Sequence, residues 1–205
     1  MEYEGLEISV ADGVYVPAED SFLAARMVSG LMDAFGRTVS VADIGTGTGI
    51  LGLVAARSAN CGKVAFYDVN PVAVELARSN YERNRRRVAA QSEFVQSDLF
   101  GSMPRAEMFD LVIFNAPYLR NEKDGEEKEG NPWAGGTEGV ELSERFLGEA
   151  VRHLGEEGRI VLVASSFSNR KRLNEKMGEL DLAILKEDKI HFFFEDISSI
   201  MIGRA

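Results

Sequence analysis

Hydrophobic positions follow two patterns along this chain: a helical spacing and short apolar runs. In residues 18–35 the apolar positions recur every three or four residues, which predicts an amphipathic helix. The same spacing returns in four later segments, 49–59, 71–87, 138–154 and 168–180. Between them lie short apolar runs that predict strands, at 39–45, 63–69, 92–100, 109–119 and 158–166. The end of the chain, 182–204, predicts two more strands that pair antiparallel.

This alternation of strands and helices is typical of an α/β fold. The runs 111–114 and 160–164 are continuously apolar, as expected for strands with helices on both faces. We therefore predict a doubly wound, mostly parallel seven-stranded sheet with a C-terminal antiparallel pair. We interpret 1–205 as one domain, with a short N-terminal extension and helix over 1–36 and a core over 37–205. Ligands of such sheets bind beyond the carboxyl ends of the strands, so candidate residues should follow strands.

Composition and charge narrow the class of function. No apolar run approaches the roughly 18 residues that cross a membrane, and the acidic N-terminus is unlike a signal peptide, so we expect a cytoplasmic protein that binds no membrane. One cysteine and two separated histidines form no ligand motif, so we expect no metal. The net charge of −10 argues against nucleic acid as the direct substrate.

A glycine-rich turn follows the first predicted strand of the core. The stretch "DIGTGTG" runs from Asp43 to Gly49 and places Gly45, Gly47 and Gly49 around Thr46. Glycines allow a tight turn that brings backbone N–H groups close to a ligand. The spacing differs from the dinucleotide pattern, and the turn holds no Lys or Arg to meet a pyrophosphate. These features favour a nucleoside with little or no negative charge.

An aspartate follows each of the next two predicted strands. Asp68, followed by Val69, can accept both hydroxyl groups of a ribose. Asp98, followed by Leu99, can accept from the exocyclic amine of adenine. Each aspartate alone is more often a turn or cap residue, but a glycine turn and two aspartates at three successive strand ends favour a nucleoside site.

These segments resemble the class I S-adenosylmethionine-dependent methyltransferases. The opening "VYVPAEDSFLAAR" and the segment "WAGGTEGVELSERFL" are similar to the HemK2-type protein glutamine N5-methyltransferases of archaea and eukaryotes. The resemblance implies a Rossmann-like fold and S-adenosyl-L-methionine as cofactor. It also implies that Asp20 and Ser21 close over the cofactor, although from the residues alone they can simply cap the first helix. The implied cofactor-binding residues are Asp20, Ser21, Asp43, Gly45, Thr46, Gly47, Gly49, Asp68, Val69, Asp98, Leu99 and Asn115.

The stretch "NAPY" at the end of the fourth predicted strand is the candidate catalytic motif. Asn115 supplies one hydrogen-bond acceptor for a planar NH2 group through its side-chain oxygen, and the carbonyl of Ala116 supplies another. Pro117 restricts the direction of that carbonyl, and Tyr118 offers an apolar face for the substrate. The family usually has Pro at position 116, so Ala116 is predicted to loosen this clamp.

The resemblance implies a substrate and a partner as well. The family methylates the glutamine of the Gly-Gly-Gln motif in class I translation release factors, often with a small zinc-binding activator subunit that pairs along a sheet edge. The strand at 64–68 is the candidate edge. The loop 121–131 and Trp133 are expected beside the substrate groove. Three alternatives stay open: a nucleic-acid adenine-N6 or cytosine-N4 methyltransferase, a protein lysine methyltransferase, and a non-catalytic nucleoside-binding module.

Overall fold

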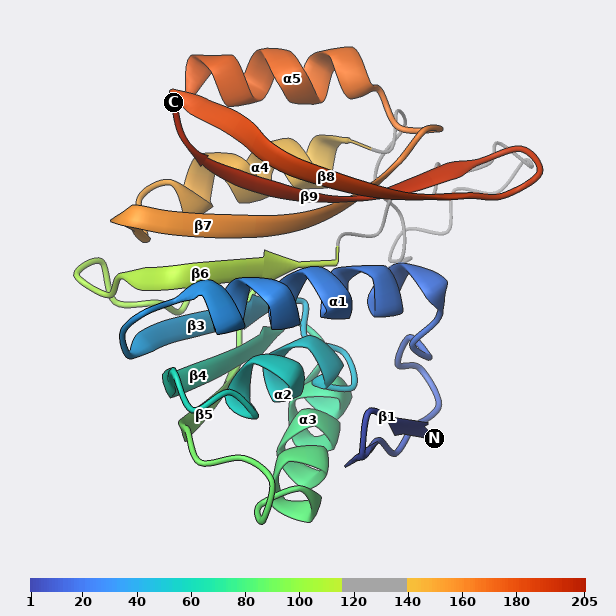
Figure 1. The fold of residues 1–205 in the computed structure, drawn as a ribbon, viewed down its shortest axis with the longest axis vertical. Helices are drawn as coiled ribbons and strands as arrows, with labels where there is room; N and C mark the ends of the chain where they lie inside the picture. The colour runs from blue at the N-terminus through green and yellow to red at the C-terminus, as the bar shows by residue number, and fades with distance from the viewer. Residues whose placement is uncertain (116–139) are drawn as a thin grey trace.

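The computed structural model describes residues 1–115 and 140–205. A seven-stranded sheet crosses the molecule in the order β5-β4-β3-β6-β7-β9-β8 (Figure 1). The five strands from β3 to β7 run parallel, and β9 pairs antiparallel with both β7 and β8. The predicted sheet and its C-terminal antiparallel pair are therefore confirmed. The strands are β3 (Val39–Ile44), β4 (Cys61–Asp68), β5 (Gln91–Gln96), β6 (Phe109–Phe114), β7 (Leu154–Ser165), β8 (Leu182–His191) and β9 (Asp196–Arg204).

Helices cover both faces of this sheet, which confirms the doubly wound arrangement. One core cluster joins α1, α2 and α3 to one face, and a second joins α4 and α5 to the other. Neighbouring strand residues divide between them: Val112 packs in the second cluster and Ile113 in the first. The helices are α1 (Glu19–Ala34), α2 (Ile50–Ala56), α3 (Pro71–Arg83), α4 (Glu141–Ala150) and α5 (Arg170–Glu179).

The sheet order corrects one prediction. The segment 64–68 belongs to β4, which pairs with β3 on one side and with β5 on the other. It is therefore an interior strand, and the edges of the sheet are β5 and β8. The apolar pattern predicted where strands lie along the chain, but strand order depends on crossovers that this pattern does not encode. The polar residues of β5 (QSEFVQ) were the available signal in the sequence. In the structure β5 is largely exposed, while β4 is largely buried.

The N-terminal segment forms a small hairpin that the sequence pattern did not predict. Its strands β1 (Glu2–Tyr3) and β2 (Leu6–Glu7) are too short to show a period. Two buried side-chain amides, Asn80 in α3 and Asn84 at its C-cap, fasten the end of the hairpin and the residues after it. The Asn80 side chain accepts from the N–H of Ser9 and donates to its carbonyl, and Asn84 does the same with Glu7. The segment before α1 is thereby fixed against α3.

Replacing Asn80 with alanine is expected to destabilise the protein by about 2–4 kcal/mol. Besides its two bonds to Ser9, the Asn80 side chain donates to the carbonyl of Thr48 at 2.9 Å, and all of these groups would lose a partner together. The free energy of unfolding from urea denaturation measures the effect. Ser79→Ala, at the exposed neighbouring position in α3, is the control. Equal unfolding midpoints for the two variants would contradict the role assigned to Asn80.

Candidate active site

A pocket of about 570 Å³ opens at the carboxyl ends of β3, β4, β5 and β6. All the sequence-predicted cofactor residues line it except Gly49. The segment before α1 closes one side through Tyr15 and Pro17, and Leu142 of α4 reaches the other. The structure therefore brings together residues from six separated segments of the chain. The candidates Ala116, Pro117 and Tyr118, the loop 121–131 and Trp133 lie outside the described residues.

The turn requires glycine at two positions, Gly47 and Gly49. Both have a left-handed backbone, and Gly49 also lies in close contact with α3. Gly49 has φ of 82° and lies so close to α3 that a Cβ would stand 3.2 Å from the Cα of Ala77. Gly49 is the N-cap of α2, so it shapes the backbone of the turn although it does not line the pocket. Gly47 has φ of 55°, and its N–H donates to Asp68 Oδ2 at 2.9 Å. The turn is thus fastened to the end of the neighbouring strand.

Asp43 lies beneath this turn and is almost fully buried. Its Oδ2 accepts from the hydroxyl of Thr46 at 2.6 Å and from the N–H of Gly52 at 2.9 Å. Burial raises the pKa of Asp43 to about 7, against the effect of these two hydrogen bonds. Asp43 lines the pocket as predicted, and its contacts add a second role, which is to hold the turn to the first turn of α2.

Asp68 ends β4 and faces the pocket with both oxygens fixed by backbone donors. Oδ2 accepts from Gly47 and Oδ1 accepts from the N–H of Asn70, each at 2.9 Å. Burial raises the pKa of this carboxyl as well. Val69 follows it in the pocket wall with about half of its surface exposed, at 55%. This placement agrees with the expected contact to ribose hydroxyls, which stays a prediction.

Asp98 has a partner that the sequence did not reveal. Its carboxylate forms an ion pair with Arg145, which comes from the exposed side of α4, and both side chains are largely open to solvent. Leu99 follows in a left-handed conformation, with φ of 46°, and is buried at the pocket wall. Asp98 therefore lies at the predicted place, with a cation beside it. Arg145 belongs to the segment "WAGGTEGVELSERFL", but its pairing with Asp98, 47 positions earlier in the chain, was not predicted.

Asn115 follows the last residue of β6, and its amide group is held in one orientation. Its Nδ2 donates to Asp20 Oδ2 at 3.0 Å and to the hydroxyl of Ser21 at 3.2 Å. A carboxylate only accepts hydrogen bonds, so it selects the NH2 side of the amide. The opposite atom, Asn115 Oδ1, is buried and has no hydrogen-bond partner among the described residues. Such an atom is an unused acceptor in the pocket wall.

Asp20 and Ser21 do not cap the first helix as N-cap residues. The N-cap of α1 is Ala18, and the two polar residues lie inside the first turn, where both are buried. Asp20 Oδ1 accepts from the N–H of Ser21 at 2.6 Å and from the hydroxyl of Tyr15 at 3.1 Å. Tyr15 was not among the candidates, although it belongs to the "VYVPAEDS" stretch. The helix start therefore supports the orientation of Asn115.

Comparison with known proteins places these features in a family. The model of the methyltransferase small domain matches residues 7–191. A protein of Methanocaldococcus jannaschii that carries a provisional name as a protein N5-glutamine methyltransferase is 30% identical, over 100% of this chain and 98% of its own length. The release factor glutamine methyltransferase of Lactococcus lactis is 26% identical, over 96% of this chain and 70% of its own.

The fold is also that of solved methyltransferases. The E. cuniculi Mtq2–Trm112 complex, described as responsible for methylation of the eRF1 translation termination factor, contains a chain with a TM-score of 0.65 and 22% identity. The alignment covers 94% of this chain and 99% of that one. Among the described residues no helix is long and apolar enough to cross a membrane. With its sheet order, its pocket and the match over 7–191, the chain belongs to the methyltransferase small domain family.

Proposed function

We propose that this protein is an S-adenosylmethionine-dependent N-methyltransferase that acts on the glutamine side-chain amide of a class I translation release factor. The observation that carries the proposal is the orientation of Asn115, whose Oδ1 is left as a buried acceptor while its Nδ2 is held by Asp20 and Ser21. The two relatives named for glutamine methylation support the same substrate. A substrate of this kind is found in the cytoplasm.

The residues of the pocket fit S-adenosyl-L-methionine. Asp68 is placed to accept from ribose hydroxyls, and Asp98 lies where an adenine amine would be recognised. The carboxylates of Asp20 and Asp68 supply negative charge for a ligand that carries a sulfonium and an ammonium group. When bound, the cofactor supplies an electrophilic methyl group. Residues 1–36 are proposed as the extension that closes over it, since Tyr15, Pro17 and Asp20 line one side of the pocket.

The proposed chemistry depends on holding a planar NH2 group. The nitrogen of an amide is a weak nucleophile, because its lone pair is delocalised into the carbonyl group. Asn115 Oδ1 accepts from one N–H, and the carbonyl of residue 116 is proposed as the acceptor for the other. Fixing both N–H groups sets the angle of approach of the nitrogen. The proton that the nitrogen loses after methyl transfer passes to water, so no side chain is assigned as a general base.

A partner subunit is proposed for the exposed edge at β5. The related solved structure is a complex of Mtq2 with Trm112. Among residues 1–115 and 140–205, β5 has a neighbouring strand on one side only, which is β4, so its other side is available to an added strand. The family resemblance supports a small zinc-binding subunit as the occupant. The strand β5 therefore replaces the segment 64–68, which lies in an interior strand, as the edge proposed to bind the partner subunit.

Methyl transfer from labelled S-adenosylmethionine tests the proposal. The protein is incubated with the matching release factor, with and without the small partner subunit, and the label is located by mass spectrometry. We expect label on the glutamine of the Gly-Gly-Gln motif. Label on a lysine, or on DNA or RNA in place of the factor, would overturn the assigned substrate. Binding of the cofactor without label on any acceptor would instead support a non-catalytic module.

Replacing Asp20 with asparagine tests how the amide of Asn115 is oriented. The new side chain can present an NH2 group where the carboxylate accepted a hydrogen bond. The Asn115 amide can then turn, so that its Oδ1 accepts from residue 20 and is no longer free for the substrate. We expect kcat to fall by about tenfold, because the turned amide becomes the favoured conformer and the acceptor stays in place in only about a tenth of the molecules. Steady-state kinetics with the release factor measures this. Ser21→Ala removes the longer of the two contacts to Asn115, together with the bond from the Ser21 hydroxyl to Asp20 Oδ1, and keeps the Asp20 carboxylate. It is the matched control and should reduce kcat less. Equal effects of the two changes would contradict the orienting role of Asp20.

A further inference from the structure

Two exposed phenylalanines form the tip of the β8–β9 hairpin. Phe193 is 95% exposed and Phe194 is 87% exposed. The turn is tight, because Phe192 and Glu195 exchange backbone hydrogen bonds of 2.7 and 3.3 Å around the two residues. Two-residue hairpin loops usually contain Asn and Gly, and neither phenylalanine has positive φ. The turn geometry therefore does not explain why two large apolar side chains face water here.

The residues that directly follow the tip are hydrogen-bonded to the end of β7. Ser165 Oγ donates to Glu195 Oε1 at 2.5 Å. Ser166 and Asp196 are joined twice, through the N–H of Ser166 to the Asp196 carbonyl and through the N–H of Asp196 to the Ser166 hydroxyl. The two rings are thus presented on an anchored support. An anchored aromatic side chain loses little conformational freedom when it binds a surface.

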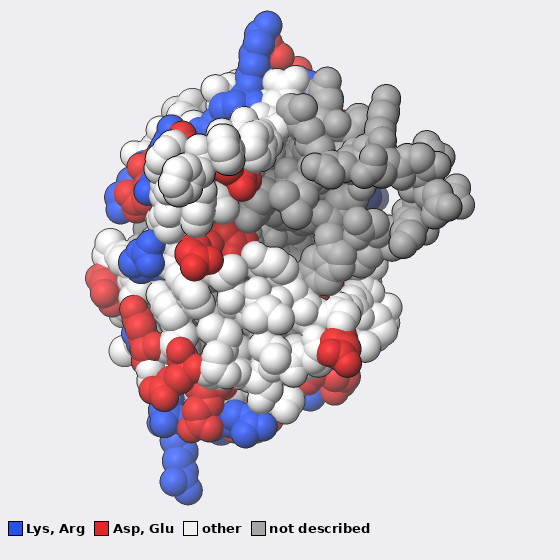
Figure 2. Space-filling model, turned by 90° about the vertical axis from the view of Figure 1, so that its right-hand side faces the viewer, with Lys and Arg blue, Asp and Glu red and all other residues white. Residues whose placement is uncertain are grey.

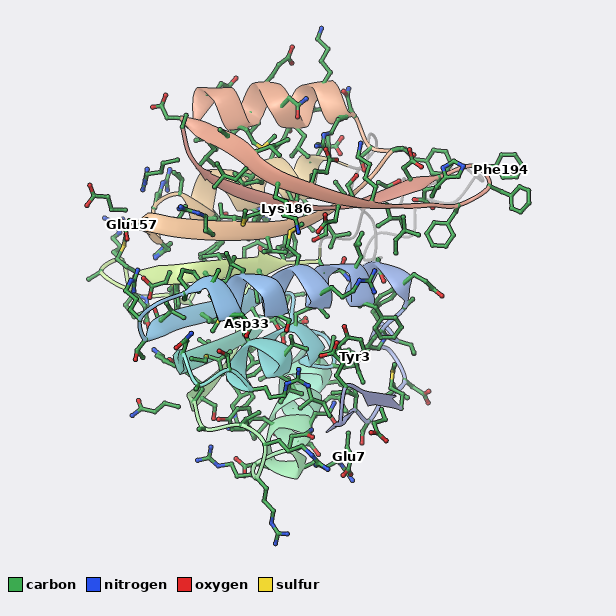
Figure 3. All side chains as sticks on the ribbon, in the orientation of Figure 1. Tyr3, Glu7, Asp33, Glu157, Lys186 and Phe194 are labelled. Carbon is green, nitrogen blue, oxygen red and sulfur yellow. The ribbon has the colours of Figure 1, made fainter. Side chains whose placement is uncertain are left out.

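The tip projects on the side of the sheet where the parallel strands end and the pocket opens (Figure 3). Phe114, the residue before Asn115, lies beside Leu162 of β7, and Leu162 lies opposite Ile200 of β9. Phe194 is six residues before Ile200, which corresponds to about 20 Å along an extended strand. The hairpin therefore extends past the end of β6. Figure 3 shows Phe194 at the end of this projection, on the side where the strand β6 ends.

We propose that Phe193 and Phe194, the aromatic tip, dock the protein substrate while its glutamine occupies the pocket. The proposal rests on the proposed function and adds the surface that recognises the substrate outside the reacting amide. The occupant is an apolar surface of the release factor that flanks the methylated glutamine. Aromatic side chains that become buried at the centre of a protein interface supply much of its binding energy.

The charges around the aromatic tip favour a protein over a polyanion. The two lysines of β8, Lys186 and Lys189, form ion pairs with Asp188 and Glu187, and Glu195 and Asp196 stand next to the tip. Figure 2 shows the face at this edge of the sheet, where uncharged residues fill the middle and Lys and Arg lie mainly at the rim. A nucleic acid or an anionic membrane needs cations close to its contact. An apolar protein surface does not.

The test compares the intact release factor with a short peptide that carries the same glutamine. For the double variant Phe193→Ala/Phe194→Ala we expect KM for the intact factor to rise at least about tenfold, with kcat and the affinity for S-adenosylmethionine little changed. The KM for the peptide, which does not reach the tip, should stay unchanged. Phe193→Leu/Phe194→Leu keeps an apolar surface and should recover most of the loss. Met108→Ala, at a side chain 47% exposed just before β6 at the opposite edge, is the matched control.

Each other outcome has a definite meaning. If the wild-type enzyme methylates the factor and the double alanine variant has the same KM, the docking role of the aromatic tip is overturned while the proposed function stands. A dimer by light scattering that becomes a monomer in the double variant would identify a second copy as the occupant and overturn the proposal. Loss of RNA binding in that variant would do the same. If the wild-type enzyme methylates no release factor, both proposals fall.

Discussion

Replacement of Asn115 by alanine is expected to lower kcat for the release factor by about 100-fold or more. The change removes the buried Oδ1, which we propose as the acceptor for the substrate amide. It also removes the Nδ2 that bonds Asp20 and Ser21, so the start of α1 loses its contact with the end of β6. Asn115 is one of several predicted cofactor contacts, and the others at Asp68, Asp98 and the glycine turn are unchanged, so we expect the Kd for S-adenosylmethionine to rise by no more than about threefold.

Two measurements make this expectation specific. Single-turnover kinetics of methyl transfer gives the rate of the chemical step, and isothermal titration calorimetry gives cofactor affinity on the same preparation. Asn115→Asp serves as the isosteric variant: it keeps an oxygen at the acceptor position but sets a carboxyl group against Asp20 where a donor stood. We expect it to be impaired as well. A rate within about twofold of wild type for Asn115→Ala would mean that the amide acceptor is not needed for catalysis.

The sequence was sufficient to predict the interior strands because they are apolar on both faces. The runs 111–114 and 160–164 are apolar without interruption, and both lie in interior strands of the sheet. The glycine turn and the two aspartates were found for a related reason. Each directly follows a strand, and the carboxyl ends of parallel strands meet at one edge, so position along the chain predicts position in space.

The contacts that the sequence did not predict join residues far apart in the chain. Asn115 and Asp20 are separated by 95 positions, and Arg145 and Asp98 by 47. Periodicity describes only local structure, and these pairs depend on how α1 and α4 pack against the sheet ends. The edge strand was misassigned for the same reason, since pairing of β4 with β5 follows from the crossover through α3. The pattern also gave no reason to expect that the amide of Asn115 is oriented by α1.

The pH dependence of stability should carry a contribution from Asp43. Burial raises its pKa in the folded state to about 7, far above that of an exposed aspartate in the unfolded chain. Below the unfolded pKa, near about 4, the carboxyl is protonated in both states and does not oppose folding. As the pH rises from about 4 to about 7, the unfolded chain releases this proton while the folded protein retains it, so the free energy of unfolding falls. Above about 7 both states are ionised and the contribution becomes constant.

A comparison of wild type with Asp43→Asn isolates this effect. Asparagine does not titrate, and its oxygen can still accept from Thr46 and Gly52. A difference of about three pKa units corresponds to about 4 kcal/mol, so the wild-type protein should lose up to about that much relative to the variant between pH 4 and pH 7. Urea denaturation of the two proteins across this range measures the difference, and Asp33→Asn, on the exposed side of α1, is the control for removal of one carboxylate. A constant difference across the range would mean that the donors from Thr46 and Gly52 keep Asp43 ionised in the fold. In that case Asp43 would carry a full negative charge in the pocket wall at every pH where the enzyme works. Its attraction for a cationic cofactor would then not depend on pH.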